Sequence, residues 1–295
     1  MPSLKDVKAK IGGVKKTRQI TKAMNMVAAS RLRGAQLRME AFRPYAAKFT
    51  EVLSNLAARA GDEASPLLLP KAEVKTVHVV LCTSDRGLCG GFNASLMDKA
   101  ADFAAERKAA GQEVKFTCFG KKGRDWARKS QYQRVADHLG VVGTRFPYTV
   151  ASKTGQSLID GFLSGESDEV YVLFSRFETM ARQKATLKQI LPVPPIEAKA
   201  EGEGGGEFMA EHICEPSAEE LMAKLLPMSV YIQVYSALLE TSTSEHAARM
   251  QAMDNATKAC NDMLDSLTLV YNKARQAAIT KELMDIVGGA EALKG

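Results

Sequence analysis

Residues 85–91, with the sequence DRGLCGG, have the glycine content of a phosphate-binding loop. They lie between an expected strand and an expected helix, where backbone N–H groups at a helix amino terminus can hold an anion. The segment lacks the Lys-Ser/Thr pair of a P-loop and does not fit the G-x-G-x-x-G pattern of dinucleotide-binding folds. We therefore favour a tight turn that needs glycine backbone angles, with nucleotide binding as the alternative.

Other residues that could do chemistry do not form a recognised set. Cys89 could act as a nucleophile with His78, but no third group completes a triad. His246 has no second ligand one turn away on its expected helix, which favours a hydrogen-bonded core histidine. His212 and Cys214 are separated by one residue, which alone is weak evidence for a metal site. The sequence therefore predicts no catalytic residue, no bound metal and no cofactor.

The cysteine pattern and the absence of long apolar runs indicate a cytosolic chain of bacterial type. The cysteines are odd in number and have no metal-type spacing, which is typical of small buried thiols in a reducing compartment. No apolar run approaches the roughly 20 residues of a membrane span, and no signal-peptide core follows the first lysines. We therefore expect no membrane insertion. The cysteines are Cys82, Cys89, Cys118, Cys214 and Cys260.

Positive charge is concentrated at the start of the chain. Residues 1–50 contain twelve Lys and Arg but only Asp6 and Glu40, a net charge of +10, whereas the whole chain of 295 residues carries +6. A basic arm of this kind favours a polyanionic partner such as nucleic acid, anionic lipid or an acidic protein surface. Residues 1–41 contain no aromatic residue, so stacking on single-stranded nucleic acid is disfavoured. We expect a helical shaft that contacts protein, and no nucleic-acid partner.

The N-terminal part of the chain has the apolar spacing of a long coiled-coil helix. Thirteen of its sixteen seam positions are apolar, Ser3 and Asp6 form a capping-box start, and Gly61 is a natural stop. At about 1.5 Å per residue this helix would be roughly 85 Å long. Its seam comprises Leu4, Val7, Ile11, Val14, Arg18, Thr21, Asn25, Ala28, Leu32, Ala35, Met39, Phe42, Ala46, Phe49, Leu53 and Leu56.

The C-terminal part of the chain has the same spacing over roughly 105 Å. Residues 215–220 supply an N-cap box, and Gly288-Gly289 is the expected end. Two helices of this length make a rod rather than a compact domain. The second seam comprises Leu221, Leu225, Met228, Ile232, Tyr235, Leu239, Ser242, His246, Arg249, Met253, Ala256, Cys260, Met263, Leu267, Val270, Ala274 and Ala277.

Each seam has one polar interruption, and such interruptions often set the register of a coiled coil. Because the entry and exit points of a domain usually lie close together, we expect the two helices to pair antiparallel. Matching the polar positions places Asn25 opposite Ser242. It also places Thr21 opposite His246, so that residues beyond about 267 project as a single helix.

The residues between the two helices indicate an α/β domain. Residues 74–83 form a nearly continuous apolar strand, as in a sheet that is covered on both faces. The fold class is α/β plus a long coiled coil, an antiparallel pair of N- and C-terminal helices around a central Rossmann-like domain. Further strands are expected at 114–119, 169–177 and 184–191, the last two as a hairpin, and helices at 94–110, 123–129 and 149–163. The expected domains are 1–60 (N-terminal helix), 61–215 (central α/β domain, or foot) and 216–295 (C-terminal helix with a projecting tip).

Three segments closely resemble the gamma subunits of F-type ATP synthases, and the resemblance covers the whole chain in order. They are ITKAMNMVAASRLR (20–33), TSDRGLCGGFN (83–93) and the segment 244–293, which contains NKARQAAITKELMDIVGGA. The resemblance implies a non-catalytic rotor shaft inside a hexamer of three alpha and three beta subunits. In that family, ion flow turns a membrane c-ring, and the ring turns the shaft. Because the shaft is asymmetric, its rotation changes the affinity of each of the three catalytic sites in turn.

The resemblance also implies the contacts and the location of the chain. Arg275, Gln276 and Thr280 match positions that touch a catch loop on beta, and Met24 matches the nearby shaft residue of the first helix. The implied location is the cytoplasmic face of the bacterial cell inner membrane, as a peripheral protein. A nucleotide-binding α/β protein with a coiled-coil interaction arm is the alternative function. Foot residues that would contact the epsilon subunit and the ring are Phe208, His212 and Cys214.

Overall fold

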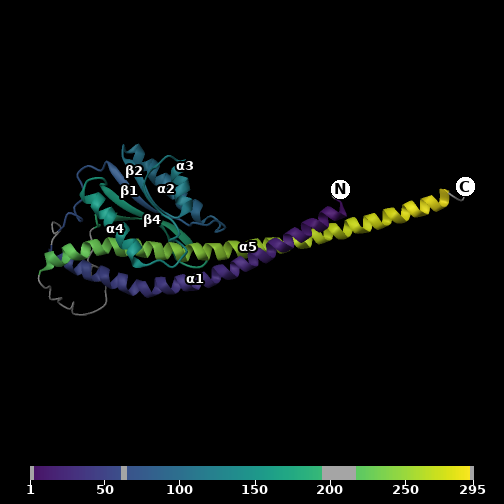
Figure 1. Ribbon diagram of the computed structural model, residues 1–295, viewed down its shortest axis with the longest axis horizontal. Coiled ribbons are helices and arrows are strands. Elements are labelled where there is room, and N and C mark those ends of the chain that lie inside the picture. Colours follow the sequence, from purple (N-terminus) through teal and green to yellow (C-terminus); the bar gives the residue numbers. More distant parts are fainter. Residues whose placement is uncertain (1–2, 61–64, 195–216, 293–295) are drawn as a thin grey trace, which may run out of the picture. The chain divides into compact units, whose positions relative to one another are not determined.

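The computed structural model describes residues 3–60, 65–194 and 217–292 (Figure 1). The chain divides into two compact units. One unit, here called the helix-pair unit, comprises Met1–Ala29 and Arg249–Gly295, and the other, the sheet unit, comprises Ser30–Ala248. Two long helices, α1 (Leu4–Ala60) and α5 (Ala218–Ala292), contribute residues to both units.

The sheet unit contains five strands in the order β3-β2-β1-β4-β5. β1 pairs in parallel with β2 and β4, β2 pairs in parallel with β3, and β5 runs antiparallel to β4. This mostly parallel sheet confirms the predicted Rossmann-like α/β class. Its elements are β1 (Thr76–Cys82), α2 (Phe92–Ala109), β2 (Glu113–Phe119), α3 (Lys121–Lys129), β3 (Gln133–His138), α4 (Tyr148–Leu163), β4 (Glu169–Phe177) and β5 (Gln183–Leu191).

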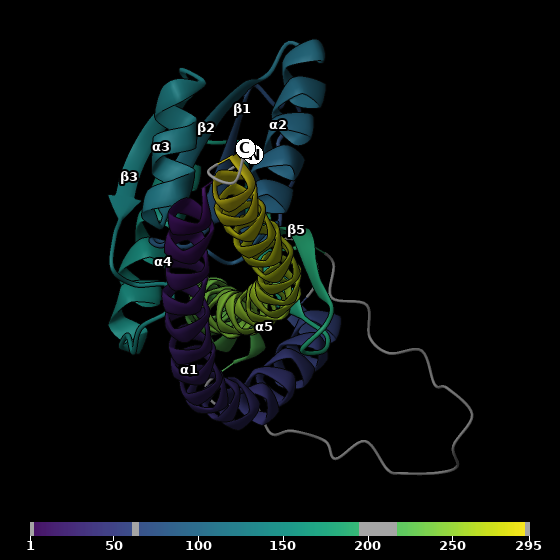
Figure 2. The same cartoon turned by 90° about the vertical axis from the view of Figure 1, so that its right-hand side faces the viewer.

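Helices cover both faces of the sheet, as the continuous apolar run of the first strand predicts. Alternate residues of β1 enter two separate cores. Val80 lies in one core with Leu158 of α4 and Leu226 of α5. Val79 lies in the other core with Leu96 of α2. Figures 1 and 2 show α2 and α3 on one side of the sheet and α4 on the other.

Both long helices begin where the sequence signals predict, but α5 does not end at its predicted stop. The capping box forms, because the Asp6 amide donates to Ser3 Oγ at 3.2 Å and the Ser3 amide donates to Asp6 Oδ2 at 3.3 Å. The amide of Glu220 donates to Ser217 Oγ at 3.2 Å at the start of α5. The expected stop at Gly288-Gly289 is wrong, because α5 continues to Ala292. Each glycine costs only about 1 kcal/mol in a helix, which does not by itself end one.

Among the described residues, one helical stretch is long and apolar enough to cross a membrane. It lies in 220–290, its mean hydropathy is 1.2, and 44% of the most apolar window is buried inside the fold. Polar residues interrupt this stretch, so the sequence contains no unbroken apolar run here, whereas the mean hydropathy of the window tolerates scattered polar residues. The core helix of a soluble protein passes the same test, so the feature is weak evidence for a membrane span.

Candidate partner-binding surface

In the helix-pair unit, α1 buries the seam that the sequence predicts. Every fully buried residue of α1 in this unit is a predicted seam position, and Val7 and Ala28 are each only 2% exposed. Side chains at other positions are mostly exposed, which leaves a wide outer surface on the helix. The two-helix pairing confirms the predicted coiled coil.

In the helix-pair unit the seam on α5 agrees with the prediction up to Cys260 and at every second position after it. Met253 is buried, and Cys260, Leu267 and Ala274 are half-buried, as predicted. The alternate positions beyond Cys260 are shifted by one residue: the predicted Met263 is 53% exposed, whereas its neighbour Leu264 is 7% exposed. Val270 is likewise exposed beside the half-buried Tyr271. Both choices give apolar residues at the required spacing, so the pattern alone could not distinguish them.

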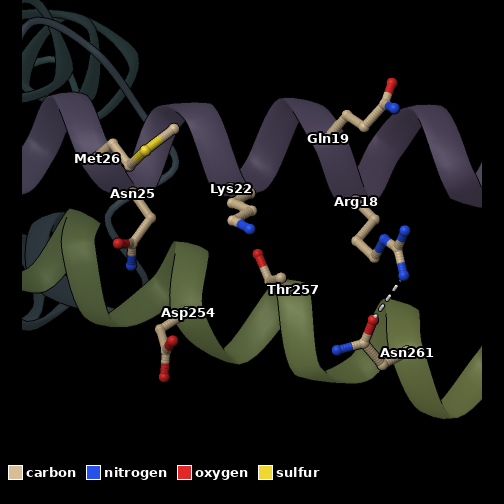
Figure 3. Close-up of a pocket in the computed structure, with 8 residues that line it drawn as sticks. All are labelled: Arg18, Gln19, Lys22, Asn25, Met26, Asp254, Thr257 and Asn261. Atoms are coloured by element: carbon tan, nitrogen blue, oxygen red, sulfur yellow. Dashed lines mark hydrogen bonds between the residues drawn. The ribbon is translucent and has the colours of Figure 1, made fainter.

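The polar part of the seam pairs in a different register from the predicted one (Figure 3). The Asn25 side-chain amide donates to the Met250 carbonyl at 2.9 Å, and Arg18 donates to Asn261 Oδ1 at 3.3 Å. The hydroxyl of Thr257 lies 2.8 Å from that of Thr21. The pairing is antiparallel as predicted, but each partner lies at least two helical turns further along α5 than expected.

The predicted partners on α5 have other contacts, which explains the error. Ser242 Oγ accepts a hydrogen bond from the Gly143 amide at 3.1 Å, and His246 Nε2 donates to the Gly143 carbonyl at 3.1 Å. Both contacts lie within the sheet unit. His246 is 3% exposed and is thus the hydrogen-bonded core histidine that the sequence predicts.

The polar pairing borders a groove between the two helices of the helix-pair unit. Its volume is 650 Å³. Arg18 and Lys22 lie one turn apart on α1 and point towards α5 (Figure 3). Asp254 of α5 forms an ion pair with Lys258 at 2.8 Å. The groove is polar and partly basic. Its lining residues are Arg18, Gln19, Lys22, Asn25, Met26, Asp254, Thr257 and Asn261.

The outer surface of the helix-pair unit carries many exposed apolar side chains. Large exposed apolar surfaces on soluble proteins mark places where other molecules bind. On α5 they occur on several faces after residue 262, so a single apolar seam does not describe this part of the helix. The residues are Ile20, Met26 and Val27 of α1, and Met263, Leu269, Val270, Ile279, Leu283, Met284, Ile286 and Val287 of α5.

The sequence-predicted beta contacts lie on this unit. Arg275, Gln276 and Thr280 are exposed on α5, and Met24 is half-buried on α1. Gln276 and Thr280 are four residues apart and therefore share one face of the helix. They are bordered by the exposed apolar Ile279. The predicted foot contacts Phe208, His212 and Cys214 lie outside the described residues.

The candidate phosphate loop begins with a residue that bonds to other segments of the sheet unit. The carboxylate of Asp85 accepts hydrogen bonds from the Lys121 amide at 3.0 Å and from the Gly140 amide at 2.9 Å. The first residue of the loop therefore joins it to the amino end of α3 and to the segment after β3, as expected of a structural turn. Gly90 has a φ of 58°, a backbone angle that glycine adopts without strain, which supports the favoured tight turn; Leu88 of the same loop adopts a φ of 62°.

The cysteines in the described part of the sheet unit are buried, which disfavours nucleophilic chemistry. Cys89 is 2% exposed and accepts a contact from the Asn93 side-chain amide at 3.2 Å, while His78 bonds to Thr117 at 2.9 Å, so the two do not form a pair. Burial, with a smaller effect of a nearby lysine, lowers the pKa of His78 to about 3. Burial raises the pKa of Cys118 to about 12, which keeps this thiol protonated. No cluster of His, Cys, Asp and Glu suited to a metal occurs among the described residues.

Comparisons with known proteins identify the relatives of the chain. The family model described as ATP synthase matches residues 3–293. The ATP synthase gamma chain of Desulfosudis oleivorans is 63% identical, and that of Desulforapulum autotrophicum is 57% identical; the alignments cover 100% and 99% of this chain and 100% of each relative. A chain in the cryo-EM structure of Euglena gracilis mitochondrial ATP synthase (OSCP/F1/c-ring, rotational state 3) has the same fold. Its TM-score is 0.65 at 18% identity, with 98% of this chain and 94% of that chain covered. The chain belongs to the family of ATP synthase gamma chains.

Proposed function

We propose that this chain is the central rotor shaft of an F-type ATP synthase. It transmits the rotation of an ion-driven membrane ring to a catalytic hexamer for ATP synthesis, or in reverse during hydrolysis, and it catalyses no reaction itself. The observation that carries the proposal is the full-length match to ATP synthase gamma chains at 63% identity. The exposed apolar surface of α5 supports it, because such a surface suits a helix that is surrounded by other subunits.

The partners in this proposal are three alpha subunits, three beta subunits, one epsilon subunit and the c-ring. The segments 1–60 and 216–295 would form the shaft, and 61–215 would form the foot. Phe208, His212 and Cys214 would contact epsilon and the ring. The proposed location is the cytoplasmic face of the bacterial inner membrane, where the chain is held through its partners rather than by insertion of its own helices.

The proposed mechanism rests on contacts that change as the shaft turns. Arg275 and Gln276 would donate hydrogen bonds to a catch loop on beta, and Thr280 would pack beside them. Met24 would contact beta from α1, since its unbranched side chain adapts to repeated repacking. Each orientation of the shaft then stabilises one set of beta conformations over the others. A shift in population follows only from this difference in contact free energy.

Coexpression with matching alpha and beta subunits tests the function. We expect a complex with three alpha and three beta subunits per copy of this chain, and ATP hydrolysis by that complex. A chain that stays apart from alpha and beta would contradict the proposal.

Two substitutions on exposed side chains of α5 then test the contact residues. Arg275→Ala should lower ATP-driven torque or assembly, whereas Lys273→Ala, an exposed cation two residues away, serves as the matched control. Equal torque, assembly and ATP synthesis in the two variants would remove Arg275 from the contact surface while leaving the shaft function intact.

A further inference from the structure

We propose that four side chains of α5 form a rotational lock, which prevents α5 from turning inside the sheet unit and so carries torque between them. The lock consists of Glu240, Ser242, Ser244 and His246. This inference rests on the proposed rotor function, and it adds the residues through which the foot is hydrogen-bonded to the shaft helix.

The lock lies where α5 is enclosed on all sides. Eight consecutive residues, 241–248, are each at most 8% exposed, and this length exceeds two helical turns. A helix that is buried all round is normally apolar. Here six consecutive buried residues, 241–246 with the sequence TSTSEH, are polar or charged instead.

Each of the four lock residues makes a hydrogen bond to a surrounding element. On one side, the Phe177 amide donates to Glu240 Oε2 at 3.2 Å and Ser244 Oγ donates to the Ser175 carbonyl at 3.0 Å. Ser175 and Phe177 both belong to β4.

The other two bonds reach the loop between β3 and α4. The Gly143 amide donates to Ser242 Oγ at 3.1 Å, and His246 Nε2 donates to the Gly143 carbonyl at 3.1 Å.

The two pairs of bonds hold opposite sides of the helix. Glu240 and Ser244 are four residues apart and share one face, as do Ser242 and His246. The two faces differ by two residues, which is about 200° around the helix axis at 3.6 residues per turn. Rotation of α5 in either direction therefore lengthens bonds on both sides at once.

Both elements that hold the helix are themselves fixed. Ser175 lies in β4, which is hydrogen-bonded to β1 on one side and to β5 on the other. The loop at Gly143 is closed by Thr144, whose amide and hydroxyl both donate to the Val141 carbonyl, at 3.2 and 2.8 Å. Val142 is anchored in the apolar core. The lock thus joins α5 to rigid parts of the sheet unit.

Directional bonds explain why polar residues occupy an enclosed site. Apolar contacts are non-directional, so an apolar helix could turn or slide between similar packed positions. Hydrogen bonds weaken steeply as their angle departs from linearity and therefore fix one orientation. A helix that passes torque to its surroundings needs this resistance to twisting.

The neighbouring hydroxyls provide a matched control. Thr243 is 0% exposed like Ser244, but its Oγ1 donates to the Leu239 carbonyl of its own helix at 2.9 Å. Ser242→Ala with Ser244→Ala removes one connecting bond from each side, whereas Thr243→Val removes a buried hydroxyl without touching the connection. The two single variants serve as the test if the double variant does not fold.

The decisive measurement uses the assembled complex with alpha and beta immobilised and a probe attached at Lys108→Cys on α2. We expect the angular variance of the probe during catalytic pauses to rise about twofold in the double variant, because two of four connecting bonds are lost. The rate of ATP hydrolysis should stay unchanged, and Thr243→Val should match the parent chain.

A second measurement uses the free full-length chain and does not depend on rotation. In Ser242→Ala the Gly143 amide should exchange with solvent about tenfold faster, since it loses its acceptor, while Thr243→Val should leave it unchanged. Equal angular variance in the double variant and in Thr243→Val would overturn the lock while leaving the rotor function standing. Failure of the parent chain to assemble with alpha and beta would instead overturn the rotor function, and the lock with it.

Discussion

Replacement of Gly143 by alanine should destabilise the sheet unit more than the same change at Gly140. Both glycines have a positive φ, 78° and 73° respectively, so alanine pays about 1–2 kcal/mol at either position. At Gly143 the added Cβ would also collide with the carboxylate of Glu245, which is 3% exposed and has little room to move. At Gly140 no atom lies within 4 Å of the new Cβ.

The collision adds a cost like that of overpacking a core, about 1–3 kcal/mol. We therefore expect Gly140→Ala to lower the free energy of unfolding by about 1–2 kcal/mol and Gly143→Ala by about 2–5 kcal/mol. Urea unfolding followed by the fluorescence of Trp126, the one tryptophan in the chain, measures both. Its ring packs edge-on against Phe116 with 5.5 Å between centroids, so it reports on the sheet unit. Equal losses in the two variants would refute the proposed close contact between the loop and α5.

Three further predictions concern titration, thiol access and a helix start. The free energy of unfolding should fall as the pH drops from about 6.5 to 3, because His78 is protonated near pH 6.5 in the unfolded chain and only at about 3 in the folded chain. His78→Gln should flatten this part of the plot of stability against pH. An unchanged slope would contradict the lowered pKa of His78. In the native chain at pH 8, a thiol reagent should modify the half-buried Cys260 before Cys82, whose pKa is raised by burial. Equal rates of modification at the two cysteines, measured by mass spectrometry, would be inconsistent with the structure. Ser3→Ala should destabilise the first turn of α1 by about 1 kcal/mol. The Asp6 amide should then exchange its hydrogen with solvent faster. An unaltered exchange rate would count against the capping box.

Much of the fold could be predicted because strong periodic patterns specify it. The N-terminal seam from Leu4 to Leu56 is buried or half-buried at every predicted position within each unit. β1 and β4, at the centre of the sheet, were recognisable from nearly continuous apolar runs. β3 was missed because four of its six residues are exposed, which leaves no apolar pattern in Gln133–His138.

The register error had a physical cause. Polar seam residues were assumed to meet one another, but the polar run around Ser242 is bonded to a loop and a strand that the linear sequence does not place beside it. Thr257 and Asn261, the polar residues that meet α1, were not recognised as seam residues. A helix with more than one buried face cannot be assigned from a single stripe.

The candidate contact residues were predicted from the resemblance to a known family and not from the spacing of residues in the sequence. Nothing in the spacing of Arg275, Gln276 and Thr280 distinguishes them from other exposed residues of α5. Their contact role stays a prediction. The same holds for Met24, whose half-buried position is compatible with the seam as well as with an outer contact.

The exposed apolar end of α5 has a consequence for biosynthesis. Leu283, Met284, Ile286 and Val287 are each more than half exposed, so a newly made chain displays them to solvent until another subunit covers them. Uncovered apolar patches of this kind promote self-association and recognition by chaperones. Production of this chain therefore has to keep pace with that of the subunits that enclose it, because any surplus is prone to aggregate or be degraded.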